Sequence, residues 1–145
     1  MRLSEVLGAG EGTYVGAHFS KESIHALVEL QEEIGVPNPV PPTDFHTTIV
    51  YSRNTIDWTP AVLNVSAGVV GYRVFGDETR ILVLELDCPT LTDRFEEAMD
   101  SGATYDFPEY IPHITLSYDI GDFNIDVLNP PTLRLIVAQE FVDDL

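Results

Sequence analysis

The order strand, helix, proline-bearing loop and His-initiated strand occurs twice in this chain. The first copy is predicted over Gly12–Ser52 and the second over Arg80–Tyr118. The closing strands align without gaps, as HTTIVY from His46 and HITLSY from His113. Because His, Thr and Tyr recur at the same offsets, the sequence predicts two structurally equivalent halves.

Alternating hydrophobicity and helix caps predict the elements of these halves. Apolar residues alternate over Gly12–Phe19, which is typical of a strand. Ser20, with Ser23 as an alternative, is expected to cap a helix that Gly35 ends. The other expected elements are strands at His46–Ser52, Val62–Phe75 (one or two, interrupted by Gly68 and Gly71), Arg80–Leu86, His113–Tyr118 and near Leu133–Val142, and a helix capped by Thr90 or Thr92 and stopped by Gly102.

We therefore expect an α+β fold in which two pseudo-symmetric lobes with antiparallel sheets line a central groove and helices lie outside. The length of 145 residues indicates one bilobal domain over residues 1–145. Apolar runs such as Ile81–Leu84 are far shorter than a membrane span, and the N-terminal residues lack the apolar stretch of a signal peptide. Cys88, the only cysteine, excludes an intramolecular disulfide and a thiolate zinc cluster. We expect a cytoplasmic protein without a membrane partner.

The charge of the chain limits its partners. Lys and Arg number 7 against 24 Asp and Glu, so the formal net charge is −17. Affinity for long nucleic acids depends on many cations meeting phosphates, and this chain cannot supply them. A small anion can still be neutralised locally, and most of the positive charge lies early in the chain, at Lys21, Arg53, Arg73 and Arg80.

The two aligned strands each present a His and a Thr on one face. Side chains two apart in a strand share a face, so His46 lies beside Thr48, and His113 beside Thr115. We expect both pairs to face a common groove. The intervening residues are expected to face the core: Ile49, Tyr51, Ile114, Leu116 and Tyr118.

Two imidazoles and two hydroxyls suit phosphodiester cleavage without a metal or other cofactor. One His can deprotonate the attacking oxygen while the other protonates the leaving oxygen. Each Thr hydroxyl can donate to a phosphate oxygen as charge develops there. A ribose 2′-hydroxyl beside the phosphate would supply the nucleophile. The alternative is that both His are ordinary strand residues with satisfied hydrogen bonds.

With these motifs, the chain resembles the two-histidine phosphoesterases, which carry two H-x-[ST] motifs on pseudo-symmetric lobes. The segments GTYVGAHFSKESIHAL, FHTTIVYSRNTID and YIPHITLSYD are most similar to the phage anti-CBASS phosphodiesterases. The resemblance implies metal-independent cleavage of 3′–5′ bonds in the cyclic di- and trinucleotide messengers of a bacterial anti-phage system. It implies a catalytic set of His46, Thr48, His113 and Thr115, and functional roles for Tyr14 and Glu140.

Other residues are candidates for substrate binding. Arg53, just after the first motif strand, is the favoured phosphate neutraliser. Tyr14 is expected on the same strand face as His18, where it can bind substrate or cap the core. Glu140 can bind a base or ribose, orient a His, or lie in solvent. Aromatic candidates for base stacking are Phe75, Tyr72 and Trp58, for which core packing is the alternative. His25 and Glu29, four apart on a helix, lack a third metal ligand, and no metal is expected.

Three other functions are consistent with parts of this pattern. A related two-histidine enzyme would act on 2′,3′-cyclic phosphates or RNA ends. A non-catalytic sponge would bind the same messengers and release them intact. An acidic DNA mimic would use the charge and be indifferent to both His. The sequence leaves open the oligomeric state, the preferred nucleotide and which His is the acid.

Overall fold

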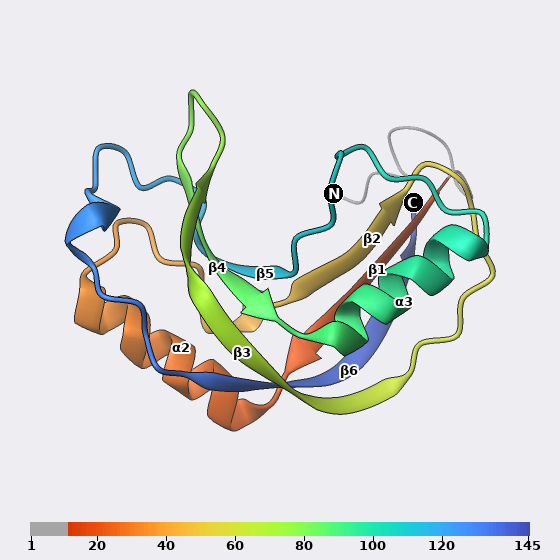
Figure 1. Cartoon of the computed structure of the whole chain (residues 1–145), viewed down its shortest axis with the longest axis horizontal. Coiled ribbons are helices and arrows are strands. Elements are labelled where there is room, and N and C mark those ends of the chain that lie inside the picture. The colour runs from red at the N-terminus through yellow and green to blue at the C-terminus, as the bar shows by residue number, and fades with distance from the viewer. Residues whose placement is uncertain (1–11) are drawn as a thin grey trace.

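The computed structural model describes residues 12–145, and an antiparallel sheet with two helices makes up most of it (Figure 1). The strands are β1 (Thr13–Phe19), β2 (Thr47–Ser52), β3 (Val62–Phe75), β4 (Ile81–Asp87), β5 (His113–Ser117) and β6 (Arg134–Asp144), and the helices are α2 (Lys21–Ile34) and α3 (Pro89–Asp100), with short 3₁₀ turns at Pro42–Asp44 and Ile125–Val127. The predicted α+β fold and the order of its elements are confirmed.

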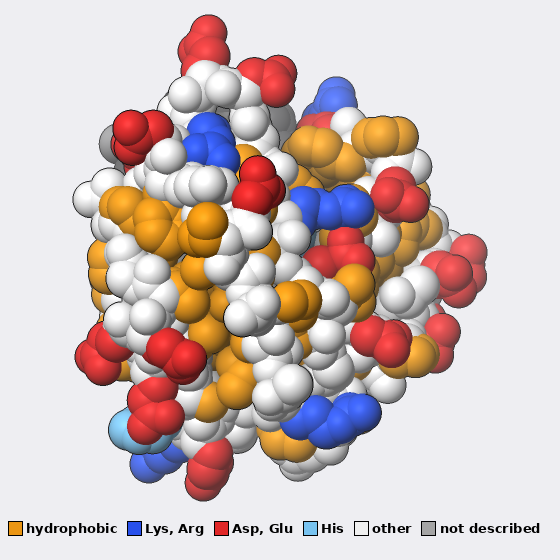
Figure 2. Space-filling view, turned by 60° about the vertical axis from the view of Figure 1, so that its left-hand side comes forward, with side chains coloured by type: hydrophobic (Ala, Val, Ile, Leu, Met, Phe, Trp, Pro, Cys, Tyr) orange, Lys and Arg blue, Asp and Glu red, His pale blue; other side chains and the backbone are white. Residues whose placement is uncertain are grey.

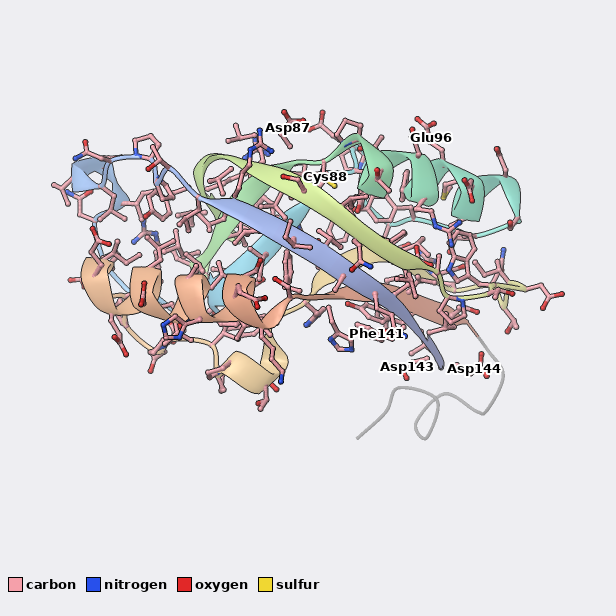
Figure 3. All side chains as sticks on the ribbon, turned by 90° about the horizontal axis from the view of Figure 1, so that it is seen from below. Asp87, Cys88, Glu96, Phe141, Asp143 and Asp144 are labelled. Carbon is pink, nitrogen blue, oxygen red and sulfur yellow. The ribbon has the colours of Figure 1, made fainter. Side chains whose placement is uncertain are left out.

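The six strands form one sheet in the order β2-β1-β6-β3-β4-β5. The half β2-β1-β6 is repeated in reverse order by β5-β4-β3, so the predicted pseudo-symmetry is present. The two lobes do not have separate sheets, because β6 pairs with β3 along residues from Val62 to Gly68 and joins the halves. Figure 3 shows β3 and β6 running side by side through the space between the two helices. The Val62–Phe75 segment is a single strand with a register shift between Val69 and Gly71.

Local signals set the ends of α2 as expected. The Ser20 hydroxyl oxygen accepts a hydrogen bond from the Ser23 backbone N–H at 3.2 Å, which satisfies a free donor of the first turn. Gly35 ends the helix with a positive φ of 66°, a conformation that favours glycine.

The predicted cap of α3 is wrong. This helix begins at Pro89, and Cys88 takes the N-cap position without a side-chain hydrogen bond. Proline is suited to the first helical position because it has no N–H to satisfy and its φ is already helical. The helix therefore starts before Thr90 and Thr92 can cap it.

Each helix contacts strands of the other repeat, and α2 also contacts β6 of its own half (Figure 1). The Gln31 amide of α2 donates to the carbonyls of Val40 and Leu116, which ties the helix to β5. In contrast, α3 contacts β2, and its Arg94 binds Glu140 of β6. The two helices thus lock the halves together behind the sheet and leave its other face free.

The outer strands of the sheet, β2 and β5, also meet. The Thr47 hydroxyl donates to the His113 carbonyl at 2.7 Å, and this bond is the direct link between the two motif strands. Thr47 is fully buried, so the bond is shielded from water. The sheet is therefore curved enough to bring its two edges together with the motifs side by side.

None of the described helices is long and apolar enough to cross a bilayer. Within residues 12–145, no group of three or more His, Cys, Asp or Glu could hold a metal ion. Figure 2 shows carboxylates scattered over one face and only isolated Lys and Arg side chains, as the net charge requires.

Candidate active site

The two motif His are held in the same way. His46 Nδ1 lies 2.8 Å from the Asp44 carbonyl, and His113 Nδ1 lies 2.6 Å from the Ile111 carbonyl. In both cases the partner is two residues upstream. A carbonyl oxygen only accepts hydrogen bonds, so each Nδ1 carries the proton and each Nε2 is left free to accept or donate one. The two rings are anchored in the same way by the backbone.

A bulge in each motif strand determines which residues face the groove. Gly16 pairs with Thr48 and Val15 with Val50, so Ile49 is an extra residue in β2. In β5, Leu116 is extra in the same way, between Thr115 and Ser117. Both bulges lie three residues after the motif His.

The bulges correct two expectations. The extra residue reverses the alternation, so Tyr51 lies on the groove face, where its ring contacts Tyr14 edge-on at 5.7 Å between centroids. Tyr118, at the equivalent position, is 54% exposed. Neither tyrosine faces the core, whereas Ile49, Ile114 and Leu116 are buried as expected.

Tyr14 and Thr48 are joined through their hydroxyl groups at 2.7 Å. Burial is the main reason that the pKa of Tyr14 is raised, to about 12, so the phenol keeps its proton at neutral pH. The Tyr110 hydroxyl donates to the Thr48 carbonyl at 2.8 Å, which fixes this strand position from the other side. Thr115 is half-buried on the face that it shares with His113, and its hydroxyl has no hydrogen bond within the described part of the chain.

A cavity of about 790 Å³ opens beside these groups, within the size range of small-ligand sites. Tyr14, Thr48, Phe75 and His113 line it, four of the residues predicted from sequence. His46 borders the same region, since its ring centroid is 6.2 Å from that of Tyr14. The rest of the wall comes from Tyr51, Gly76, Ile81 and the segment from Tyr105 to Ile111.

Phe75 and Arg53 lie close to the site in different ways. The Phe75 ring contacts His113 edge-on, with centroids 5.0 Å apart, and lines the cavity. Arg53 is exposed and paired with Asp106, a residue of the cavity wall, through a hydrogen bond of 2.9 Å from Nε. The guanidinium is therefore at the rim, with part of its charge neutralised.

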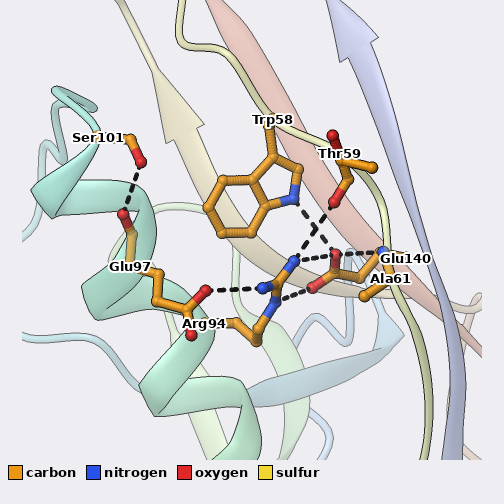
Figure 4. Close-up of polar contacts among 7 residues, drawn as sticks. All are labelled: Trp58, Thr59, Ala61, Arg94, Glu97, Ser101 and Glu140. Atoms are coloured by element: carbon orange, nitrogen blue, oxygen red, sulfur yellow. Dashed lines mark hydrogen bonds and ion pairs between the residues drawn. The ribbon is translucent and has the colours of Figure 1, made fainter.

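Glu140 does not reach the groove, in contrast to the expectation (Figure 4). Its pairing with Ala17 places it on the core face of β6, and its side chain is fully buried. The carboxylate accepts hydrogen bonds from Arg94 at 2.7 Å, from the Ala61 backbone N–H at 2.8 Å and from the Trp58 indole at 3.3 Å. It is neither solvated nor in contact with a His, and its role is to bind β6, α3 and the loop before β3 together.

The other aromatic candidates also pack away from the groove. Trp58 lies under the Arg94 guanidinium, 4.3 Å from the ring centroid. Tyr72 packs against the core on the opposite face of β3 from Phe75. His25 is exposed as expected and pairs with Glu29 at 3.0 Å.

The sequence analysis missed the segment from Tyr105 to Ile111, which forms one wall of the cavity. The sequence feature that could have indicated this wall is a group of aromatic residues, Tyr105, Phe107 and Tyr110, in a proline-containing stretch without periodicity. Phe141 was also missed. The Phe141 ring stacks on the His18 ring, with centroids 4.5 Å apart. It also lies across Gly16, where a Cβ atom on that residue would be only 2.6 Å from the Phe141 ring.

The environments of the two His differ. Burial lowers the pKa of His113, the nearby charge of His46 lowers it further, and the bond to Ile111 only partly offsets both effects. His113 is therefore unprotonated at neutral pH.

Residues 11–145 match the family model described as "Anti-CBASS protein Acb1". The chain belongs to this family. It is 36% identical to the Acb1 protein of Vibrio phage KVP40, over 100% of this chain and 94% of that protein. It is 41% identical to the Acb1 protein of Enterobacteria phage T4, over 84% of this chain and 83% of that protein. The resemblance to this family that the two motifs indicated is thus confirmed along the length of the chain.

Solved structures confirm the fold of this Acb1 relative. E. coli LigT complexed with phosphate has a TM-score of 0.60 at 12% identity, and LigT complexed with 3′-AMP has 0.58 at 14%. Both comparisons cover 94% of this chain and 88% of LigT. At such low identity the likeness establishes the shared architecture.

Proposed function

We propose that this protein is a metal-independent phosphodiesterase that cleaves 3′–5′ bonds in cyclic di- and trinucleotides and so disables CBASS defence. The observation that carries this proposal is the equivalent anchoring of His46 and His113 by their Nδ1 atoms, with His113 lining the cavity and His46 next to its wall residue Tyr14. Membership of the Acb1 family supports the substrate class. The site of action would be the cytoplasm of the infected bacterium.

The reaction needs one proton removed and one supplied. A base His takes the proton of the ribose 2′-hydroxyl, the 2′-oxygen bonds to phosphorus, and the bond from phosphorus to the 5′-oxygen breaks. An acid His protonates the departing 5′-oxygen. The product end is a 2′,3′-cyclic phosphate. Because the two imidazoles supply both proton transfers, the step requires no metal.

The burial of His113 supports a proposal for these roles. His113, whose pKa is lowered by burial, is neutral at neutral pH and suits the base. His46 then suits the acid, and its proton disfavours a second one on His113. The cycle begins with one imidazole neutral, to take up a proton, and the other protonated, to supply one.

The threonines would bind the phosphate between the rings. If the Tyr14 phenol donates to the Thr48 hydroxyl, the proton of Thr48 is free to point at a phosphate oxygen. The Thr115 hydroxyl, unpartnered within residues 12–145, would donate from the other side. Donors placed in advance stabilise the charge of the transition state.

The cavity suits a compact ligand with bases. Phe75, Tyr105, Phe107 and Tyr110 give it aromatic walls, and nucleobases stack on aromatic rings. Among the described residues that line it there is no Lys or Arg. A long nucleic acid would find few cations here, whereas a cyclic dinucleotide presents only two phosphodiesters.

The test is mass spectrometry of cyclic di- and trinucleotides incubated with the protein in chelator. We expect linear products, first with a 2′,3′-cyclic phosphate end. Intact ligand recovered from the protein would instead indicate a sponge. Faster turnover of an RNA oligomer ending in a cyclic phosphate would favour an RNA-end enzyme, and binding of a basic partner that survives loss of both His would favour an acidic mimic.

A further inference from the structure

Arg73 and Glu85 form an ion pair on the groove face of the second half. Arg73 Nε lies 3.2 Å from Glu85 Oε1. In the sheet register Glu85 pairs with His113, Arg73 pairs with Val83, and Val83 pairs with Thr115. Directly paired residues project from the same face of a sheet, so this ion pair shares the face of the second motif.

Burial supports this placement. Tyr72 and Val74, the neighbours of Arg73 in β3, pack against the hydrophobic core on the other face. Val83 is fully buried but does not belong to that core, as expected for a residue beneath groove-facing side chains. Arg73 keeps 44% of its side chain exposed and Glu85 24%, so solvent reaches the pair, which lies outside the cavity lining but near its wall residue Phe75 on β3.

The pseudo-symmetry of the sheet shows what is unusual about Arg73. In the first half, the row across the strands is Thr48, Gly16 and Phe141. In the second half the equivalent row is Thr115, Val83 and Arg73. The row from one motif threonine thus ends in an aromatic ring, and the row from the other ends in a cation.

The donors of Arg73 are available, unlike those of several other arginines. Arg94 is bound to Glu140, Arg80 donates to the carbonyls of Gly121 and Phe123, and Arg134 donates to Ser66. Arg73 Nη1 and Nη2 have no hydrogen-bond partner within residues 12–145. A guanidinium fork with two free nitrogens matches two oxygens of a phosphate.

We propose that Arg73, oriented by Glu85, binds the phosphodiester of the substrate that is not being cleaved. This inference rests on the proposed function and names its second phosphate subsite. Two strand spacings put the Cα atoms of Thr115 and Arg73 about 10 Å apart, a distance that the long arginine side chain narrows. A cyclic oligonucleotide always presents a second phosphodiester, whereas a single-phosphodiester substrate does not.

The experiment compares Arg73→Gln with wild type on cyclic di-AMP and on the linear dinucleotide ApA, which has one phosphodiester. We expect KM for cyclic di-AMP to rise about tenfold to a hundredfold with kcat within about threefold, and kcat/KM for ApA to stay within about twofold. Arg134→Gln, at an exposed arginine at the start of β6 that donates to Ser66, is the matched control and should leave both substrates unaffected. Arg73→Lys keeps the charge without the fork and should raise KM for cyclic di-AMP several-fold.

An unchanged KM for cyclic di-AMP in Arg73→Gln would show that the ion pair is only a surface contact, and it would overturn the inference. An equal loss on both substrates would also overturn it, because Arg73 would then act on the scissile phosphate or the fold. If Arg73→Gln does not fold, Arg73→Lys decides by the same criterion. Failure of wild type to cleave any cyclic nucleotide would refute the proposed function itself, which separates the two failures.

Discussion

Each motif imidazole has a fixed tautomer. Carbonyl acceptors at Asp44 and Ile111 hold the proton on Nδ1, so in the proposed mechanism Nε2 is the atom that takes or gives a proton. The orientation of each ring is set by a backbone carbonyl two residues before the His and not by a distant carboxylate. A short sequence unit can therefore carry a complete acid–base group.

The pH dependence follows from the two environments. We expect kcat/KM to be bell-shaped, because the base must be neutral and the acid protonated. The base His113 has a pKa below its usual value of 6.5, so activity should persist below pH 6.5 and fall only as His113 takes up a proton. Activity should fall on the alkaline side, where a general acid no longer holds its proton. Initial rates measured across pH with a cyclic dinucleotide check this, and an acid limb above pH 6.5 would contradict the assignment of His113 as base.

Tyr14→Phe tests the hydroxyl pair in the site. The variant keeps the ring but leaves Thr48 without its partner at 2.7 Å. We expect kcat to fall about fivefold to thirtyfold, as for the loss of one well-placed hydrogen bond, with the free energy of unfolding nearly unchanged. Tyr51→Phe, which keeps an aromatic neighbour of Tyr14, serves as control. A kcat for Tyr14→Phe equal to that of wild type would show that Thr48 does not depend on Tyr14.

The motif residues could be predicted from sequence because period two in a strand places His and Thr together. The position of Glu140 could not, since it depends on Arg94, which is 46 residues earlier and on a different element. In an acidic chain a single Glu gives no local sign of such a partner. The same holds for Arg53, whose pairing with Asp106 appears only in the fold.

At the scale of elements, the bulges in β2 and β5 were not predicted. The pattern HTTIVY gives no sign that Ile49 is extra, because strand register is set by the partner strand. The consequence is that Tyr51 faces the site. By contrast, the Ser20 cap and the Gly35 stop of α2 are local signals, and the sequence was sufficient for them.

The buried pair of Arg94 and Glu140 should matter more to stability than any surface ion pair. We expect Glu140→Gln to lower the free energy of unfolding by about 3 kcal/mol, because it leaves the largely buried charge of Arg94 with only the exposed Glu97 as an ionic partner. This loss of free energy is at the lower end of the range for breaking a buried ion pair, because 19% of the Arg94 side chain remains exposed. Urea denaturation measures the change.

Glu97→Gln is the matched control, since Glu97 pairs with the same arginine but is 58% exposed. We expect it to cost less than about 1 kcal/mol. A Glu140→Gln variant as stable as Glu97→Gln would show that the cluster in Figure 4 does not hold β6 and α3 together.

In the whole molecule, the two halves of the internal repeat contribute residues to one candidate site. The exchange of helices between halves and the bond from Thr47 to the His113 carbonyl keep the motif strands adjacent. The repeat could be predicted from sequence. The single continuous sheet and the crossing of the helices could not, because both depend on contacts between segments far apart in the chain.

The central claim is that His46 and His113 act together on one phosphorus atom. The most direct measurement is the single-turnover rate of cyclic dinucleotide cleavage, in chelator, for His46→Ala and His113→Ala beside His25→Ala, an exposed control on α2. We predict that each motif variant loses about a thousandfold in rate while remaining folded, and that His25→Ala cleaves as wild type does. Cleavage near the wild-type rate by either motif variant would contradict the account.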